Sequence, residues 1–470
     1  MADARNAEAM FALNRLVGPE IGELLEQRRF DRLRAALLEL EPPDVADLVE
    51  GLEQDQAALV FRLLPRDLAT EVFSHLEPDR QQSLIASLGT ERVAALINEL
   101  DPDDRTALLE ELPAEVAQRL IALLTPAERS VTQSILGYPE ESVGRLMTPD
   151  YVRVKAEWTI ARALDHIRKY GRDAETVNVI YVIDEGGRLI DDLHIRQFLF
   201  ASPQQTVESL MDRKVVALAA TDDREEAVRL MQHYDLIALP VVDSRGILVG
   251  IVTADDVADV AEEEATEDIQ KMGGMEALDA PYLEIRMGQM LRKRGGWLSV
   301  LFVGEMLTAT AMAYFEHEIE KAVVLALFIP LIISGGGNAG SQACSLIIRA
   351  MALGEVGLRQ WWRVLRRELA SGLMLGALLG TIALLRIVLW PTRDVLYGEH
   401  YVLIALTVSF SVVGVVTFGT IAGSMLPFLL RRLGFDPAAA SAPFVATLVD
   451  VTGVVIYFSC AALILRGTLL

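Results

Sequence analysis

The sequence predicts a multidomain protein with an N-terminal α-solenoid, a paired α/β module, a connecting helix and an all-α membrane domain of five helices. Three observations predict it: a proline repeat before residue 140, a duplicated strand–turn–strand pattern between residues 147 and 260, and five long apolar segments after residue 292. The length of 470 residues is typical of about three domains. We expect the parts to span residues 1–140, 141–260, 261–291 (the connector) and 292–470.

Residues 29–137 contain a helical repeat. Pro78, Pro102 and Pro126 recur at an interval of 24 residues, in the similar segments LEPDRQQSLIASL, LDPDDRTALLEEL and LTPAERSVTQSIL. Proline is favoured in the first turn of a helix, and an Asp, Glu or Thr just before it can cap the unpaired amides. The repeat therefore predicts stacked helical hairpins that form an α-solenoid. Helix capping is the simplest role for Asp101.

Two segments, residues 181–199 and 240–257, repeat one pattern of strand, D-x-x-G turn, strand and helix. Each follows an amphipathic helix, TIARALDHIRKYG or DREEAVRLMQHYD. The two halves resemble the CBS-domain pair, a regulatory module that often binds adenine nucleotides. The resemblance implies ATP as a ligand of the second half, where Asp255 can hold a ribose. The first half departs from this pattern, because Arg196 and Gln197 stand at the corresponding places.

Five apolar segments follow, each near or above the roughly 20 residues that a helix needs to cross a bilayer. They are residues 297–315, 323–351, 370–390, 402–430 and 442–465. Basic residues cluster on one side of the spans, whereas the loops 316–321 and 391–401 are more acidic. By the positive-inside rule, the N-terminus is expected in the cytoplasm and the C-terminus outside.

Charge is unevenly divided along the chain. Residues 1–290 hold 29 Lys+Arg and 56 Asp+Glu, a net charge of −27; the rest hold 14 and 10, a net charge of +4, and the sum is the −23 of the whole chain. A region this acidic repels nucleic acid and attracts metal cations, although a solvated acidic surface accounts for most of its carboxylates. The two cysteines both lie in apolar segments, which excludes a disulfide framework. The sequence holds no phosphate loop and no enzyme signature.

Asp450 lies in the middle of the last apolar segment. A charge at a helix centre costs roughly 2.5–3.5 kcal/mol in a membrane, and such residues usually mark an ion path. Helical spacing places Thr447, Gly453 and Tyr457 on the same face, which suits a wet lumen. The alternative is a protonated carboxyl that hydrogen-bonds a neighbouring helix.

Glu305 is a second acid within the apolar segments. Three roles stay open for it. It pairs with Arg386, lines the pore, or lies protonated within the helix bundle.

The second span contains three consecutive glycines, Gly335–Gly337, followed by Asn338. We expect the glycines to break the helix and to release carbonyl groups that line an aqueous cavity. Carbonyl and amide oxygens are hard ligands, which suit Mg²⁺ or its water shell, so Asn338 is a candidate metal ligand. The alternative is close helix packing, which already accounts for the glycines between Gly372 and Gly380 and for Gly419 and Gly423.

Two acidic groups stand out before the spans. Asp101, Asp103 and Asp104 are close together in the solenoid, and eight carboxylates lie between Asp255 and Asp268. Like charges at this density repel one another, and a divalent cation relieves that repulsion.

Taken together, the solenoid, the CBS pair, the connector and the motifs GGNAGSQ and PFVATLVDVTG strongly resemble the MgtE family of magnesium channels. The resemblance covers essentially the whole chain. It implies a homodimer in the bacterial inner membrane, a pore at the dimer interface, and a connector that closes the pore when internal Mg²⁺ is abundant.

Matching positions carry the family's metal-binding residues onto this chain. Asp450 is then the carboxylate of the pore. The implied regulatory acids are Glu71, Asp103, Asp223, Glu225, Asp235, Asp256, Glu264, Glu267 and Asp268. The family can use a further acid four residues after Asp103, where this chain has Ala107.

The sequence thus predicts a Mg²⁺-selective channel for passive influx, closed by cytosolic Mg²⁺, and not an enzyme. A divalent ion gains about 4.6 kcal/mol on entering a cell at 100 mV inside-negative, so no other energy source is needed. Two alternatives stay open: a secondary divalent-cation exchanger or exporter, and a membrane-tethered metal or nucleotide sensor that transports nothing.

Overall fold

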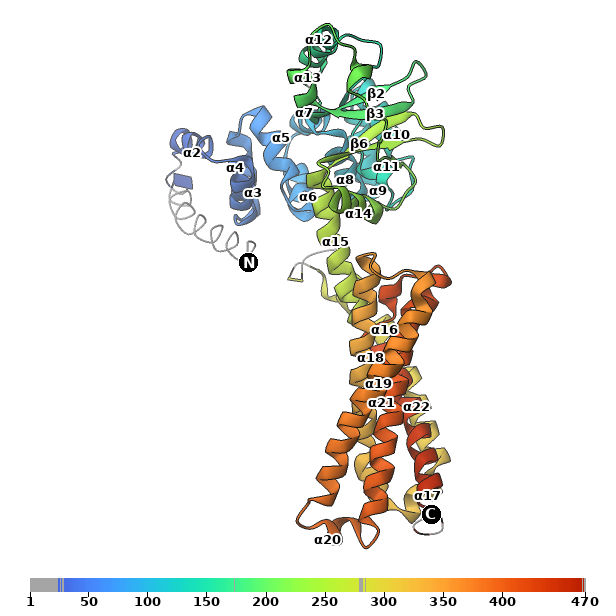
Figure 1. The fold of residues 1–470 in the computed structure, drawn as a ribbon. Coiled ribbons are helices and arrows are strands. Elements are labelled where there is room, and N and C mark those ends of the chain that lie inside the picture. The colour runs from blue at the N-terminus through green and yellow to red at the C-terminus, as the bar shows by residue number, and fades with distance from the viewer. Residues whose placement is uncertain are drawn as a thin grey trace. The chain divides into compact units, whose positions relative to one another are not determined.

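The computed structural model describes residues 24–25, 27, 29–172, 174–278, 282–283, 285–466 and 468. The chain divides into two compact units, Met1–Ala261 and Glu262–Leu470. The first unit runs from blue to green in Figure 1, and the second runs from yellow to red.

Short helices in series form the first part of unit 1. They are α2 (Phe30–Leu37), α3 (Pro42–Glu50), α4 (Gln54–Leu63), α5 (Arg66–Ser74), α6 (Pro78–Ser87), α7 (Thr90–Glu99), α8 (Pro102–Glu111), α9 (Ala114–Leu123) and α10 (Pro126–Ile135). From α3 to α8, each helix packs on the helix two places along, as α3 does on α5 and α8 on α10. One continuous apolar core runs through the stack. The predicted solenoid is confirmed.

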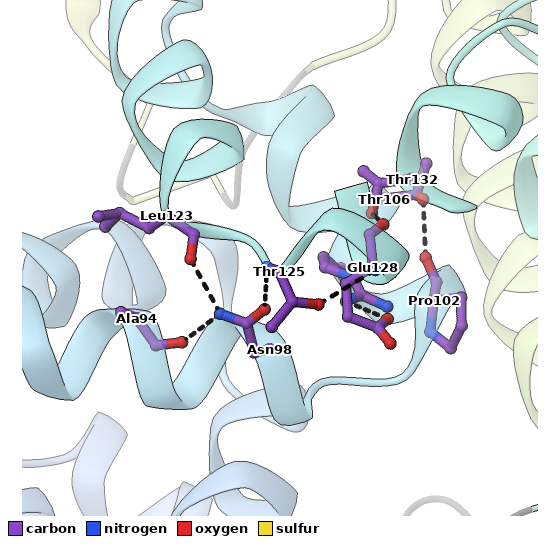
Figure 2. A network of polar contacts seen from close by, with 9 residues as sticks. Ala94, Asn98, Pro102, Thr106, Leu123, Thr125, Glu128 and Thr132 are labelled. Carbon is purple, nitrogen blue, oxygen red and sulfur yellow. Dashed lines mark hydrogen bonds and ion pairs between the residues drawn. The ribbon is translucent and has the colours of Figure 1, made fainter. Parts of the chain in front are cut away.

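A polar network around Asn98 ties successive helices of the solenoid together (Figure 2). Its amide nitrogen donates to Ala94 O at 2.6 Å and to Leu123 O at 3.1 Å, and its amide oxygen accepts from Thr125 N at 2.7 Å. The Thr125 hydroxyl caps α10 by accepting from Glu128 N at 3.3 Å.

Asp101 occupies the place before α8 that Thr125 occupies before α10, but its side chain makes no capping hydrogen bond. The capping interpretation of Asp101 is therefore wrong. Asp101 is exposed instead, and its carboxyl group acts on the nearby Asp104 and Glu175.

The rest of unit 1 is the paired α/β module. Its elements are α11 (Val143–Leu146), β1 (Tyr151–Lys155), α12 (Ile160–Tyr170), β2 (Thr176–Ile183), β3 (Leu189–His194), α13 (Ile195–Phe200), η1 (Val207–Leu210), β4 (Leu218–Ala219), α14 (Arg224–Tyr234), β5 (Ala238–Val242), β6 (Leu248–Thr253) and the start of α15 (Ala254–Met272). Each half holds a three-stranded sheet, in the orders β1-β2-β3 and β4-β5-β6. In each, the first strand pair is parallel and the second antiparallel.

The D-x-x-G turns close the antiparallel pairs as predicted. Asp184 Oδ1 accepts from Arg188 N at 2.8 Å, and Asp243 Oδ1 accepts from Ile247 N at 2.9 Å. The glycines of the two turns, Gly187 and Gly246, have φ of +82° and +78°, a conformation that other residues adopt only at a cost.

Among the described residues of unit 2, five helices are long and apolar enough to cross a membrane, as the sequence predicted. Its elements are α16 (Met287–Tyr314), α17 (Glu316–Lys321), η2 (Val323–Phe328), α18 (Ile329–Ala352), η3 (Leu358–Gln360), α19 (Trp361–Val388), α20 (Arg393–Tyr397), α21 (Tyr401–Arg432), η4 (Pro437–Ala439) and α22 (Ala442–Ile464). Helix α21 packs on α18, α19 and α22, and α16 packs on α22.

The glycines of α18 do not break the helix. It runs without interruption through Gly335–Gly337, so the predicted release of carbonyl groups is wrong. A methyl group on Gly336 would lie 2.5 Å from Val415 Cγ1, and one on Gly340 would lie 2.9 Å from Gly419 O. The glycines instead allow α18 and α21 to approach closely, which was the alternative interpretation.

Candidate cation pathway and acidic sites

Asp450 lies half-buried in the middle of α22. Its carboxyl group adjoins that of Glu305 of α16. Arg386 stacks instead on Trp390, with its guanidinium 3.4 Å from the ring centroid, so the pairing of Glu305 with Arg386 is not observed. Within the described residues, no ion pair to Asp450 is found.

The face of α22 around Asp450 is less wet than the sequence suggested. Gly453 and Tyr457 are buried in the helix bundle, and the Tyr457 hydroxyl donates to Leu325 O at 2.8 Å. The Thr447 hydroxyl donates to Pro443 O at 3.0 Å, within the helix. Because exposed Glu305 adjoins the half-buried Asp450, the polar surface lies between α16 and α22.

Asn338 lies on an exposed face of α18, and its amide nitrogen donates weakly to Ser334 Oγ at 3.5 Å. On the following turns, Ser341, Gln342, Ser345 and Leu346 line an open hollow of about 460 Å³. The Ser341 hydroxyl donates to Ala442 O at 3.3 Å, which ties this part of α18 to the start of α22. A groove with hydroxyl and amide groups therefore adjoins the helix that carries Asp450.

The strongest concentration of buried charge is in unit 1, at the start of α15. Asp103 of α8 is 8% exposed, and Asp256 accepts a hydrogen bond from the Thr253 hydroxyl at 2.8 Å. Burial, with Asp256 and Asp104 nearby, raises the pKa of Asp103 well above its ordinary value. Burial and neighbouring acids raise the pKa of Asp104 to about 6 and that of Glu175 to about 7.

Burial also raises the pKa of Asp256 to about 7, against the opposing effect of its hydrogen bond from Thr253. The nearest buried cation, Arg105, is 1% exposed and forms an ion pair with Glu128 Oε2 at 2.6 Å. The acid cluster (Asp101, Asp103, Asp104, Glu175, Asp255, Asp256 and Asp259) therefore gathers carboxyl groups that raise the pKa of one another.

The remaining implied acids of unit 1 are not brought together in one chain. Glu71 is exposed on α5. Asp223 caps the start of α14 by accepting from Glu225 N at 3.0 Å, whereas Asp235 ends the same 11-residue helix in a left-handed conformation. In the described part of the chain, no group of three or more His, Cys, Asp or Glu is positioned to hold a metal ion.

The last acids of α15 lie in unit 2, where Glu264, Glu267 and Asp268 are half-buried. Lys271 forms an ion pair with Glu267, and its Nζ donates to Asp436 Oδ2 at 2.6 Å. Burial opposes the charge of Lys271, but the hydrogen bonds to Asp436 and Glu267 raise its pKa above the ordinary value. Burial and Asp436 raise the pKa of Asp268, which Lys271 counteracts.

Two members of these sites were missed by sequence reasoning, Glu175 and Asp436. Glu175 stands alone in a loop before β2, and no sequence signal marks it. Asp436 precedes Pro437 and caps η4 by accepting from Ala438 N at 2.8 Å. That Asp–Pro pair is a helix-start signal, which could have located the turn but not its contact with α15.

Comparisons with known proteins agree with this architecture. The family model for the MgtE divalent cation transporter matches residues 329–460, that for the MgtE intracellular N domain matches 40–141, and that for the CBS domain matches 143–203 and 207–263. A magnesium transporter MgtE of Thermus thermophilus is 42% identical over 72% of this chain and 73% of its own length. The chain belongs to the MgtE family.

Two further relatives are informative. A magnesium transporter MgtE of Bacillus subtilis is 31% identical over 71% of this chain and 72% of its own length. A crystal structure of the cytosolic domain of the Mg²⁺ channel MgtE in complex with ATP is 40% identical, with a TM-score of 0.50, and covers 51% of this chain and 98% of that one. The MgtE chain described here is therefore a membrane protein of a magnesium-transporter family, and not an enzyme.

Proposed function

We propose that this MgtE chain forms a Mg²⁺-selective channel for passive influx, with Asp450 as the carboxylate that the ion passes. The observation that carries the proposal is the position of Asp450. It lies at the middle of the apolar helix α22 and adjoins a second acid, with no ion pair among the described residues. Two carboxyl groups at this depth are costly unless they face a cation or water. Mg²⁺ dehydrates reluctantly, so it passes Asp450 with most of its water shell.

Closing is proposed to depend on cytosolic Mg²⁺. The acid cluster at the start of α15 gathers carboxyl groups that repel one another, and a divalent ion relieves this repulsion. Because α15 continues from Ala254 to Met272, binding at its start can be passed along the connector to the membrane unit. The implied acids Glu71, Asp223, Glu225, Asp235 and Glu264 are proposed to bind Mg²⁺ only with groups from a second copy, as a homodimer supplies.

The proposed setting is the inner membrane of a bacterium, with the N-terminus in the cytoplasm and the C-terminus outside. Basic residues around α16, α19 and the end of α21 support this orientation. We keep the domain boundaries 1–140, 141–260, 261–291 and 292–470 as part of the proposal.

ATP is proposed as a ligand of the second CBS half. The structurally similar cytosolic domain was crystallised with ATP. In this chain, Asp255 is exposed in the first turn of α15, directly after β6. The matching Gln197 of the first half accepts a hydrogen bond from His194 N at 2.8 Å, so its side chain caps the start of its own helix, α13. Equilibrium binding of ATP to the full chain tests this assignment.

The channel is tested by Mg²⁺ flux into liposomes that contain a Mg²⁺-sensitive dye. Asp450→Ala should insert and fold normally, because the substitution removes a costly charge, but its flux should fall to the background of empty liposomes. Glu399→Gln, which changes an exposed acid between two spans, is the control and should keep wild-type flux. Wild-type flux through Asp450→Ala would rule out Asp450 as the pore carboxylate.

One observation favours a second candidate, a proton-coupled exchanger. The carboxyl groups of Glu305 and Asp450 adjoin, and two such groups repel one another unless one of them carries a proton, which an entering cation would displace. The same liposomes distinguish the two functions. A channel conducts without a pH gradient, whereas an exchanger needs a counter-flow of protons and is driven by an imposed pH difference.

A further inference from the structure

The last turns of α15 are attached to the rest of unit 2 through Lys271. Its ammonium group bridges Glu267, one turn earlier on the same helix, and Asp436, which lies 165 residues away in sequence. The other carboxylate oxygen of Asp436 caps η4. Since α22 begins three residues after η4 ends, one side chain links the connector to the turn that precedes the helix of Asp450.

A second contact fixes the same junction. Gly274 ends α15 with φ of +77°, and a methyl group there would lie 3.1 Å from both Pro443 Cγ and Trp297 Cδ1. The Trp297 indole in turn donates to Ser441 Oγ at 3.2 Å, and Ser441 caps α22. The end of the connector is therefore packed against the first turn of α22.

Much of the negative charge at this junction is offset by bases of the chain itself. Glu267, Asp268 and Asp436 carry the negative charge, Lys271 bridges two of them, and Arg349 acts on Asp268. The Lys271 Nζ takes the place that a divalent ion needs in order to bridge Glu267 and Asp436. At the acid cluster of unit 1, by contrast, the buried Arg105 forms its ion pair with Glu128, which is not a member of the cluster.

We propose that Lys271 is a built-in cation that holds the end of the connector on the first turn of α22 without any metal. Mg²⁺ then controls closing mainly through the acids nearer the start of α15. The main role of Glu267 is to pair with Lys271, and binding a metal ion is secondary. The proposal rests on the proposed function, because it takes the connector to control the pore. Lys271 is a positioning residue in this scheme, since it acts through the turn before α22.

Amide hydrogen exchange across Gly273–Leu278 tests the attachment directly in the full chain, in detergent and with a chelator present. Lys271→Met should exchange about two- to fivefold faster than wild type, the effect of losing an exposed or partly buried ion pair. Lys271→Arg should exchange like wild type. The reversed pair Lys271→Asp with Asp436→Lys should also restore slow exchange, because the opposite charges meet again.

Addition of Mg²⁺ distinguishes attachment of the connector by the Lys271 ammonium group from attachment by a metal ion. It should slow exchange in Lys271→Met, where a divalent ion can bridge the two unpaired, half-buried carboxylates, but have little effect on this segment in wild type. Unchanged exchange in Lys271→Met under chelator would overturn the proposal. So would a wild type whose segment is slowed by Mg²⁺ as much as that of the variant.

Single-channel recording at low internal Mg²⁺ tests the consequence for the pore. The open probability should rise in Lys271→Met and return to the wild-type value in the reversed pair. An unchanged open probability would overturn the role of Lys271 in closing, even where exchange is faster. If the wild type carries no current at all, the channel function fails, while the exchange measurements still decide whether Lys271 holds the connector.

Discussion

The two ends of α15 carry similar numbers of acids but neutralise them differently. At its start, Asp256 lies with Asp103, Asp104 and Glu175, and burial and mutual repulsion raise the pKa of each group. At its end, Lys271 lies between Glu267 and Asp436 and compensates their charge. A divalent cation therefore gains more by binding at the start of the helix than at its end.

The two internal bases also differ in their burial. Arg105 is 1% exposed, whereas Lys271 is 29% exposed. A buried ion pair that loses one partner leaves an uncompensated charge in a poorly solvated place, but water can solvate the partners of a half-exposed one. Arg105 should thus matter for folding, and Lys271 for the position of the connector.

The largest expected effect is the loss of Arg105. Arg105→Met should lower the free energy of unfolding of the cytosolic region by about 3 kcal/mol, because Glu128 and Asp101 lose their buried cation. The first measurement is denaturant unfolding of the purified chain. The second is the protection of α8 and α10 from amide hydrogen exchange. Lys271→Met is the matched control and should cost less than about 1 kcal/mol. Equal losses in the two variants would contradict the comparison.

The second effect concerns the metal. Mg²⁺ at 100 times its dissociation constant should stabilise the cytosolic region by about 2.7 kcal/mol, since it binds the folded cluster. The double variant Asp103→Asn with Asp256→Asn should lose this gain and should be more stable than wild type under chelator, because two repelling charges are removed. The measurement is the melting temperature with and without Mg²⁺.

Asp79→Asn provides the control for the metal effect. Asp79 follows Pro78 as Asp103 follows Pro102, one repeat earlier, but it is exposed. It should keep the whole Mg²⁺-dependent gain. A double variant that still gains wild-type stability from Mg²⁺ would place the metal outside this cluster.

The sequence predicted the elements well because their signals are local. The interval between Pro78, Pro102 and Pro126 indicates where helices start, and the D-x-x-G turns indicate paired strands. The length of the apolar segments indicates the membrane spans. Family resemblance added Asp103 and Asp256, which the structure places in one cluster.

Other features depend on contacts between distant segments, which no local pattern contains. The glycines of α18 were expected to break the helix, but their role depends on Val415 and Gly419 of α21, about 80 residues away. Glu267 was expected to be a metal ligand from the family resemblance. Its link to Asp436 through Lys271 follows only from the packing of α15 near η4. The assignments of Asp450 and Asn338 stay predictions that flux measurements decide.

The smallest of these effects is a dependence of stability on pH that should arise mainly at the start of α15. The folded pKa of Asp104 is about 6 and those of Glu175 and Asp256 are about 7, all above the value of about 4 that unfolded carboxyl groups have. The folded chain therefore binds more protons than the unfolded chain between pH 4 and pH 7, and its stability should fall as pH rises through that window.

The expected loss between pH 5 and pH 7.5 under chelator is about 1–2 kcal/mol, because one pKa unit corresponds to about 1.4 kcal/mol and the coupled groups do not add fully. Denaturant unfolding at fixed ionic strength measures it. Saturating Mg²⁺ should reverse the trend, since the metal binds the ionised carboxylates and competes with protons. Asp256→Asn should flatten the slope, whereas Asp79→Asn, which changes an exposed acid outside the cluster, should leave it unchanged. A metal-free stability that rises with pH would mean that the carboxylates of the cluster are already neutralised, and the contrast between the two ends of α15 would be lost.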